Sequence, residues 1–511
     1  MNRSPYLEEV RRLEEQDDIE GLIDLVQSSQ HLAQEMQAAL WQLLPAMQIR
    51  PAYLTAMLLA NLGHRHPIIF MTLCLGGHQY HNPIEERRGF DGLASLVGSL
   101  SPAQQEQLNL DVVYPVMVHL LRAQLADPAG EEGMPRILDI LRGTDPRFHA
   151  MFDRNAPAPA IDLERMRQRG RERARLVQYA LPPAGVPRVA RSAMIATWGI
   201  GDELGLRMTL AMRSYGWLAD FMSHPPTLDP ATGCRAIAER CVQARAEVLI
   251  LALDHVIGHD GQPYRELCLF LRQSQPACKV VGVLFDTWGG RAAGILAPLQ
   301  DVLDGVWSHD LPTLPLWDSP ALAGKVLRAN PLPVGGAFPV STAPLLPMPL
   351  FSGSIQGWNW PRAFWRTAIW QAGLPCRTEY SSSLFALRLT PEENHASFLA
   401  YMRRISEATC CLNLTMRQNL EYVVTCRAFD VPLSGALLLQ ESTPDMDCYF
   451  IAGEHYLEFS SIAELTAVVR FLTEQPDAAE EIRRAGHAFA RERYGDDKLI
   501  GYLDHLLFAG Q

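Results

Sequence analysis

The stretch that decides the fold is residues 247–286, where EVLILALD (247–254) and KVVGVLFD (279–286) flank a helical pattern at 262–274. Two apolar runs of strand length on either side of a helix are typical of a β–α–β unit with a parallel, fully covered sheet. Further strands are predicted at SAMIATWG (192–199), WLADFMSH (217–224) and DGVWSHD (304–310), with helices at 203–214, 230–243 and about 290–302. We therefore expect a Rossmann-like domain of five strands that ends near residue 330.

A second series of the same kind follows the Pro- and Gly-rich segment 331–349. Its predicted strands are LFSGS (350–354), CRTEY (376–380), CCLNLT (410–415) and ALLLQ (436–440). Helical patterns separate them, and helices run from 461 to the end. Two Rossmann-like domains in tandem are typical of a two-lobed enzyme that binds its ligand in a cleft at the carboxyl ends of the strands.

The rest of the chain divides into two segments. Residues 1–150 show apolar residues at three- and four-residue steps, which predicts a helical domain, of unknown role. Residues 151–190 form a Pro-rich linker around the arginine-rich stretch LERMRQRGRERARLV (163–177). That stretch is interpreted as a solvated helix, with an anionic partner for its arginines as the alternative. The two lobes then occupy 191–335 and 336–511.

Composition excludes several classes of protein. The 511 residues are 48% hydrophobic, and 57 acidic against 45 basic residues give a net charge of −12. Such a chain can bury several cores, and its charge argues against binding to nucleic acid or to a membrane surface. The ten cysteines form no CxxC pair and are expected to be buried thiols. Because no apolar run is long enough to span a bilayer and no signal peptide is visible, we expect a cytoplasmic protein.

Residues that could carry chemistry follow the predicted strands of the second lobe. Gly353 and Ser354 end its first strand, and Arg362 stands just beyond. Farther along, a strand ends at Asn413, a loop carries Arg417, and a short helix holds Arg427 and Asp430 before Ser434 and Gly435. An acidic side chain can accept hydrogen bonds from a ribose, and arginines can pair with a diphosphate. A surface helix with a solvated Arg–Asp pair explains the same pattern, and both interpretations stay open.

Two candidate metal motifs are interpreted as non-metal. Asp445-Met446-Asp447 is a DxD motif within the segment that leads to Phe450. In LDHVIGHDG (253–261), Asp254, His255, His259 and Asp260 follow a strand. Such loop residues usually cap a backbone or face solvent, and a substrate contact by Asp254 or His255 is the alternative favoured over a metal. We expect no metal site.

The stretch 401–465 resembles the C-terminal glycosyltransferase module of the CgeB-like spore maturation protein family. These are GT-B enzymes related to the group-1 retaining glycosyltransferases. The matching residues are Asn413, Arg427, Phe429, Gly435, Ala436, Leu437, Leu438, Phe450, Gly453, Glu454, Phe459, Ser461, Glu464 and Leu465. The resemblance covers roughly 345–509, weakens over 192–330, and is absent from 1–150. Asp430 stands where the family has Glu, which shortens the side chain by one methylene.

The resemblance implies an α/β protein of GT-B type, with two Rossmann-like domains facing a cleft behind an all-α N-terminal domain. It implies transfer of a sugar from a nucleotide-diphosphate sugar to a protein or glycan acceptor, with retention and without a metal or other cofactor. Asp430 would then bind the ribose and Arg427, with Arg362 or Arg417, the diphosphate. Amides at Gly353–Ser354 and Ser434–Gly435 would complete the cradle near Asn413.

In the same interpretation His255 and the first lobe would contact the acceptor, and a protein partner would bind through residues 1–150. The alternative is a catalytically inactive, transferase-like scaffold that binds partners through its helical domain.

Overall fold

The computed structural model describes residues 5–43, 48–80, 82–97, 146–153, 155–181, 188–198, 202–224, 229–253, 261–284, 291–308, 319–327, 331–353, 361–379, 390–416 and 422–509. The chain divides into two compact units. The first contains residues 1–156 together with 355–372 and 417–420, and the second contains 157–354, 373–416 and 421–511. The division into a linker and two lobes at 151–190, 191–335 and 336–511 stays a prediction.

The first unit is helical in its described residues, as predicted. Its helices are α1 (Pro5–Glu15), α2 (Ile19–Ser28), α3 (Ala33–Leu43), α4 (Ile49–Asn61), α5 (Pro67–Gln79), α6 (Pro83–Val97), α10 (Pro146–Phe152) and α16 (Pro361–Gln371). Helix α16 packs Phe364 and Trp365 against Phe148 and Phe152 of α10, with ring centroids 5.9 and 5.0 Å apart. These aromatic pairs explain why α16, distant in sequence, belongs to the N-terminal unit.

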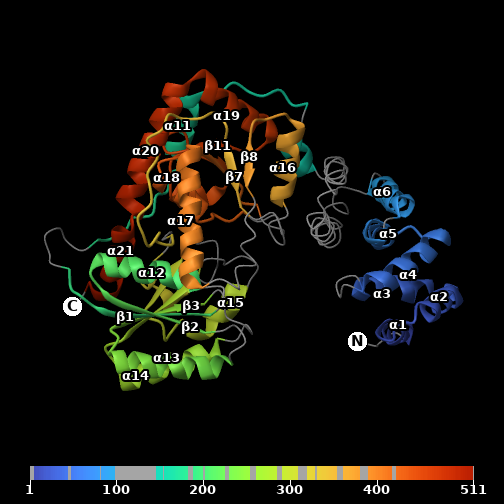
Figure 1. Cartoon of the computed structure of the whole chain (residues 1–511), viewed down its shortest axis with the longest axis horizontal. Coiled ribbons are helices and arrows are strands. Elements are labelled where there is room, and N and C mark those ends of the chain that lie inside the picture. Colours follow the sequence, from blue (N-terminus) through green and yellow to red (C-terminus); the bar gives the residue numbers. More distant parts are fainter. Residues whose placement is uncertain are drawn as a thin grey trace. The chain divides into compact units, whose positions relative to one another are not determined.

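The second unit holds two parallel sheets. The first has the order β2-β1-β3-β4-β5-β6, formed by β1 (Ser192–Trp198), β2 (Leu218–His224), β3 (Val248–Ala252), β4 (Lys279–Leu284), β5 (Gly305–Ser308) and β6 (Val326–Leu327). Its helices are α12 (Asp202–Tyr215), α13 (Pro230–Ala244), α14 (Gln262–Ser274) and α15 (Arg291–Leu296). In Figure 1, α13 and α14 cover one face of this sheet and α12 the other. The five predicted strands are confirmed, and β6 is additional because two residues are too few to show a pattern.

The second sheet has the order β11-β10-β9-β7-β8. Its strands are β7 (Leu350–Ser352), β8 (Arg377–Glu379), β9 (Cys410–Asn413), β10 (Leu437–Glu441) and β11 (Leu457–Phe459). Helices α17 (Pro391–Ala408) and α18 (Arg427–Leu433) lie between strands, and α19 (Ile462–Glu474), α20 (Pro476–Tyr494) and α21 (Asp496–Phe508) close the chain. The predicted fold class is therefore confirmed: two Rossmann-like parallel sheets, as in the GT-B type, with a helical N-terminal region. The cleft between them stays a prediction.

Both sheets reverse their strand order at the first strand, because the second strand pairs on one side and the third on the other. In open parallel sheets, ligands bind outside the carboxyl ends of the strands at this switch point. In the second sheet it lies between β7 and β9, next to Gly353 and Asn413.

The predicted helix at 163–177 is present as α11 (Leu163–Arg173), and most of its residues are exposed, but the face with Met166 and Gly170 is buried on the second sheet's domain. Asp162 caps it by accepting a hydrogen bond from the Arg165 amide at 2.9 Å. Gly170 lies so close to Ala452 that a Cβ there would come under 3.0 Å from the Ala452 carbonyl oxygen. Beyond the helix, the amides of Arg175 and Val177 donate to the carbonyls of Asp447 and Cys448 at 2.8 and 3.1 Å. We call residues 162–179 the strap.

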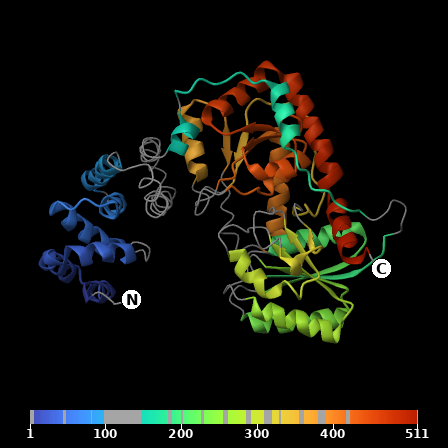
Figure 2. The same ribbon diagram turned by 180° about the vertical axis from the view of Figure 1, so that it is seen from behind.

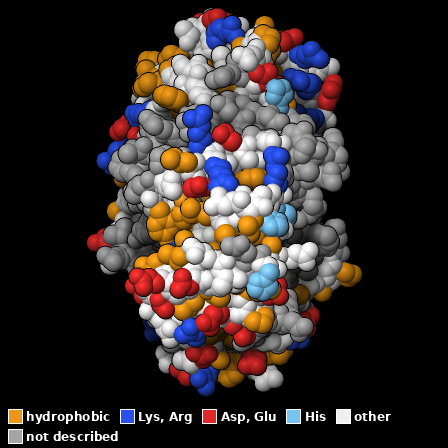
Figure 3. Space-filling view, turned by 90° about the vertical axis from the view of Figure 1, so that its right-hand side faces the viewer, with side chains coloured by type: hydrophobic (Ala, Val, Ile, Leu, Met, Phe, Trp, Pro, Cys, Tyr) orange, Lys and Arg blue, Asp and Glu red, His pale blue; other side chains and the backbone are white. Residues whose placement is uncertain are grey.

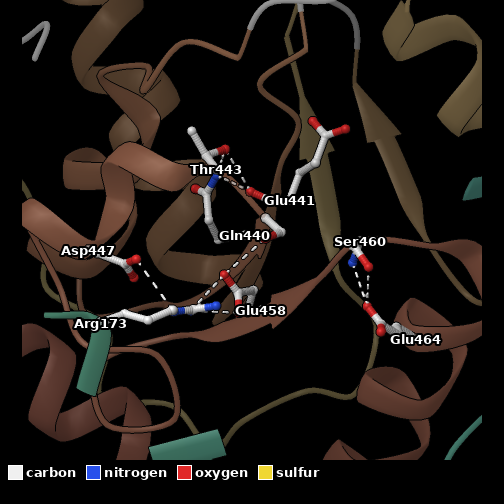
Figure 4. A network of polar contacts seen from close by, with 9 residues as sticks. Arg173, Gln440, Glu441, Thr443, Asp447, Glu458, Ser460 and Glu464 are labelled. Carbon is white, nitrogen blue, oxygen red and sulfur yellow. Dashed lines mark hydrogen bonds and ion pairs between the residues drawn. The ribbon is translucent and has the colours of Figure 1, made fainter. Parts of the chain in front are cut away.

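Three of the six arginines of the strap pair with carboxylates of the same chain. Arg173 bridges Glu458 at 2.9 Å and Asp447 at 3.4 Å, as Figure 4 shows. Arg171 pairs with Glu454, and Arg167 pairs with Glu481 of α20 at 3.1 Å. Figure 2 shows α11 running alongside α20. Carboxylates of the protein itself therefore pair with these three arginines, and a separate anionic partner stays a prediction.

The last helix connects the two sheets of the second unit. Helix α21 packs on α12, and its Asp504 pairs with Arg191 at 2.9 Å. At the start of α21, the Asp496 carboxylate accepts hydrogen bonds from the amides of Val334 and Gly335 at 2.7 and 2.9 Å. The Asp496 side chain therefore joins the two segments that run between the sheets, namely the connection at residues 334–335 and the start of α21.

Two further expectations concern the whole chain. All ten cysteines are free thiols, eight of them buried, which confirms their interpretation as small core residues. None of the helices in the described ranges combines the length and the apolar character that a bilayer crossing requires.

Candidate functional site

The centre of the candidate site is the guanidinium of Arg427, at the switch point of the second sheet. A Cβ at Gly353 would lie 2.5 Å from Arg427 Nη2, so only glycine leaves room for this arginine beside the end of β7. Gly353 has φ 155°, a backbone conformation that residues with side chains rarely adopt. The position therefore combines an unusual backbone with a close approach of a cation.

Arg427 is held from three directions. Its Nε donates to the hydroxyl of Tyr401 on α17 at 3.3 Å, and its Cζ lies 5.9 Å from the centre of the Phe351 ring on β7. Burial raises the pKa of the Cys411 thiol on β9 to about 12, and the positive charge of Arg427 opposes part of that rise. The cation is therefore close to both β7 and β9. Its Nη1 is buried and has no hydrogen-bond partner among the described residues.

An unpaired N–H on a buried cation is costly, commonly by 1–3 kcal/mol or more. A ligand oxygen that accepted from Nη1 would remove that cost, and an anionic oxygen would also pair with the charge. The arrangement at the end of β7 can therefore bind an anion.

Asp430 lies one turn after Arg427 on α18 and is only 4% exposed. The charges of both residues influence Tyr401. Burial raises the pKa of this phenol, the negative charge of Asp430 raises it further, and the positive charge of Arg427 opposes the rise. Residues 428–433 of α18 are buried and Arg427 is half-buried, so the alternative of a solvated Arg–Asp pair on a surface helix is wrong. Ribose binding by Asp430 stays a prediction.

The expected amide cradle is not formed by Gly353, Ser434 and Gly435. The Gly353 amide donates to the Glu379 carbonyl at 3.1 Å, which extends the pairing of β7 with β8. The amides of Ser434 and Gly435 donate to the carbonyls of Asp430 and Pro432, both at 3.0 Å, at the C-terminal end of α18. Gly435 is needed there for its φ of 76°. Gly353 contributes space for Arg427 rather than a donor for an anion.

Asn413 belongs to a buried network at the ends of β9 and β10. Its Nδ2 donates to Gln440 at 2.7 Å, and its Oδ1 accepts from Thr425 at 2.9 Å. The neighbouring Glu441 carboxylate accepts from the amides of Thr415 and Met416 at 2.5 and 3.1 Å. These contacts fix the backbone that follows β9, as far as Met416. A direct contact of Asn413 with a ligand stays a prediction.

Five other predicted residues cannot be placed in this arrangement. Ser354, Arg417, Asp254 and His255 lie outside the described residues. Arg362 is described and buried on α16, which belongs to the first unit rather than to the unit of Arg427.

Sequence reasoning missed Tyr401, which supplies the acceptor for Arg427. A signal was present, since Tyr401 and the buried Ile405 and Ala408 share one face of a predicted helix at steps of four and three. Of the DxD motif, Asp447 is paired with Arg173. Within the described residues, no three His, Cys, Asp or Glu side chains gather as a metal site would require.

Comparison with known proteins is consistent with this location. Residues 353–498 match the model of a family described as glycosyl transferase-like. The matched segment begins at Gly353 and includes Tyr401, Arg427 and Asp430. The curated proteins contain no match to the chain.

Solved structures with a distant likeness include glycosyltransferases. Anabaena Alr3699/HepE in complex with UDP has a TM-score of 0.41 at 8% identity, over 62% of this chain and 100% of that one. Sucrose-phosphate synthase from Thermosynechococcus elongatus has 0.42 at 12%, over 63% and 100%. An alpha-glucosyltransferase in complex with UDP-glucose and DNA has 0.43 at 10%, over 62% and 100%.

Proposed function

We propose that the protein is a glycosyltransferase of GT-B type that transfers a sugar from a nucleotide-diphosphate sugar to a protein or glycan acceptor. The single observation that carries the proposal is Arg427, whose buried Nη1 has no partner among the described residues and whose Nη2 lies against Gly353. This cation stands where a parallel sheet binds its ligand. The family match over 353–498 supports the same reaction class.

In this proposal the second lobe binds the donor and the first lobe the acceptor. Arg427 pairs with the diphosphate and stabilises the negative charge that develops as the nucleotide leaves. Removal of one such donor typically raises the activation barrier by about 2.7–4 kcal/mol. Asp430 accepts from the ribose, Arg362 or Arg417 adds a second cation, and His255 contacts the acceptor. We propose retention of configuration and independence of metal, so activity should survive EDTA.

The proposal is tested by nucleotide binding. UDP, GDP, ADP and CMP are each added to the full-length protein, and thermal unfolding is recorded. A ligand at about 100 times its Kd stabilises the folded state by about 2.7 kcal/mol, enough to shift the unfolding temperature. Hydrolysis of the corresponding sugar nucleotide then identifies the donor.

Two variants locate the site. Arg427→Met and Asp430→Ala should each abolish the nucleotide-induced shift. Asp445→Ala is the matched control, because it removes a carboxylate of the DxD motif from the same lobe and should leave the shift intact. If no nucleotide shifts the wild-type protein, the transferase proposal fails and the non-catalytic scaffold takes its place.

We further propose that the N-terminal helices bind the acceptor or a protein partner. Among them Ile84 is 76% and Ile19 47% exposed. Figure 3 shows apolar side chains among charges of both signs on the face in view. Ile84→Lys should raise the KM for the acceptor while leaving the KM for the donor unchanged, and equal changes in both would contradict this role.

A further inference from the structure

We propose that Tyr401 is a positioning residue of the donor site, whose hydroxyl orients the Arg427 guanidinium toward the diphosphate. The inference rests on the proposed function and adds a residue that neither the sequence motifs nor the family resemblance indicated. It follows from how the N–H groups of Arg427 are distributed among their neighbours.

A guanidinium offers five N–H donors in a fixed plane, so fixing one of them sets the direction of all the others. Here Nε donates to Tyr401 Oη at 3.3 Å. Nη2 lies beside Gly353, and Nη1 is buried without a partner in the described part of the chain. The hydroxyl therefore occupies the single Nε donor and leaves the two terminal nitrogens for a ligand at the end of β7.

The hydroxyl is itself held in place by a rigid element. Tyr401 lies on α17, an 18-residue helix whose first turn carries a complete capping box between Thr390 and Glu393. Its neighbour Met402 is fully buried, which anchors this part of the helix on the sheet. A flexible arginine side chain is thereby tied to a helix that is fixed at both its start and its centre.

Charge state favours the same role. Burial raises the pKa of Tyr401, with Asp430 raising it further and Arg427 opposing the shift. The phenol is therefore neutral at physiological pH. A neutral hydroxyl accepts from Nε and keeps its own proton to donate, so it orients the cation without neutralising it. An acidic residue at this position would instead pair with Arg427 and compete with the diphosphate.

The test compares Tyr401→Phe with Tyr494→Phe. Both remove one hydroxyl from a packed tyrosine of the same unit, since Tyr494 donates to the Tyr449 carbonyl at 3.0 Å away from the site. With UDP or the nucleotide that binds the wild-type protein, Tyr401→Phe should weaken affinity about tenfold, the size of one charge-assisted hydrogen bond. Tyr494→Phe should lower the unfolding temperature and leave affinity unchanged. Unchanged affinity in Tyr401→Phe would overturn the proposal.

A double-mutant cycle separates positioning from a general structural effect. Lysine in place of Arg427 keeps the charge but lacks the planar fork that the bond to Nε orients, so Tyr401→Phe should have a much smaller effect on affinity in an Arg427→Lys background. An equal loss in both backgrounds would show that Tyr401 acts without Arg427, against the proposal. The same cycle, measured by urea unfolding without ligand, should show non-additive midpoints, and additive midpoints would also overturn it.

These arms distinguish the two proposals. A wild-type protein that binds no nucleotide contradicts the proposed function, whereas the urea cycle still reports whether Tyr401 holds Arg427. If the wild-type protein binds a nucleotide and Tyr401→Phe binds it equally tightly, only the positioning role is contradicted.

Discussion

Gly170→Ala in α11 tests the docking of the strap by the sign of its effect on stability. In a solvated helix this substitution stabilises, because alanine exceeds glycine in helix propensity by about 0.8–1.0 kcal/mol. In the docked helix, the new Cβ would lie under 3.0 Å from the Ala452 carbonyl oxygen and 3.0 Å from its nitrogen. The two arrangements of the strap therefore predict opposite changes in the free energy of unfolding.

The magnitude follows from the overlap. To reach ordinary contact, the helix must move away from Ala452 by about 1 Å, and overpacking of this kind costs about 1–3 kcal/mol. The same movement stretches the bond from Arg167 Nε to the Gly453 carbonyl, now 3.1 Å long. After subtraction of the gain in propensity, we expect Gly170→Ala to destabilise the protein by up to about 2 kcal/mol.

The assay is urea unfolding of the full-length protein with Gly294→Ala as the matched control. Gly294 lies in α15, and a Cβ there would meet no atom within 4 Å, so that substitution should stabilise. The expected result is opposite shifts of the unfolding midpoint for the two variants. Equal stabilisation by both would refute the docking of α11.

Three further predictions concern the second sheet's domain. Gly353→Ala should weaken nucleotide binding measured by calorimetry because its Cβ displaces Arg427, whereas Gly373→Ala, with φ 64° and open space around it, should not. Burial lowers the pKa of His455 to about 4 from 6.5, so stability should fall as the pH drops from about 6.5 toward 4, and urea midpoints of His455→Phe should lose this slope. Arg483→Met, which removes a buried cation bonded to two backbone carbonyls and a glutamate, should destabilise by about 3 kcal/mol in urea unfolding.

Most of the fold could be predicted from local patterns. The buried runs of β3 and β4 and the helix between them are visible in sequence because all residues of β3, and all of β4 after Lys279, are apolar. The docking of the strap could not be predicted from local patterns, since the contact of Arg167 with Gly453 joins residues 286 positions apart. A run of arginines has the same composition whether its partner is water or a distant carboxylate.

The candidate site was predictable in part for a related reason. Arg427 and Asp430 were identified because they share a short helix that follows a strand, which is a local arrangement. The amides of Gly353, Ser434 and Gly435 bond within the protein because the same glycine pattern serves a helix end at Gly435 and a close side-chain approach at Gly353. Tyr401 escaped notice because its partner lies on a different element, 26 residues away.

The docking of the strap also has a consequence for how the protein is made. On the ribosome, residue 167 is synthesised 286 residues before its acceptor at residue 453. At roughly 5–20 residues per second, the strap waits about 15 to 60 s before its docking surface exists. Over that interval its arginines face solvent or a chaperone, and the second domain can complete its assembly only near the end of translation.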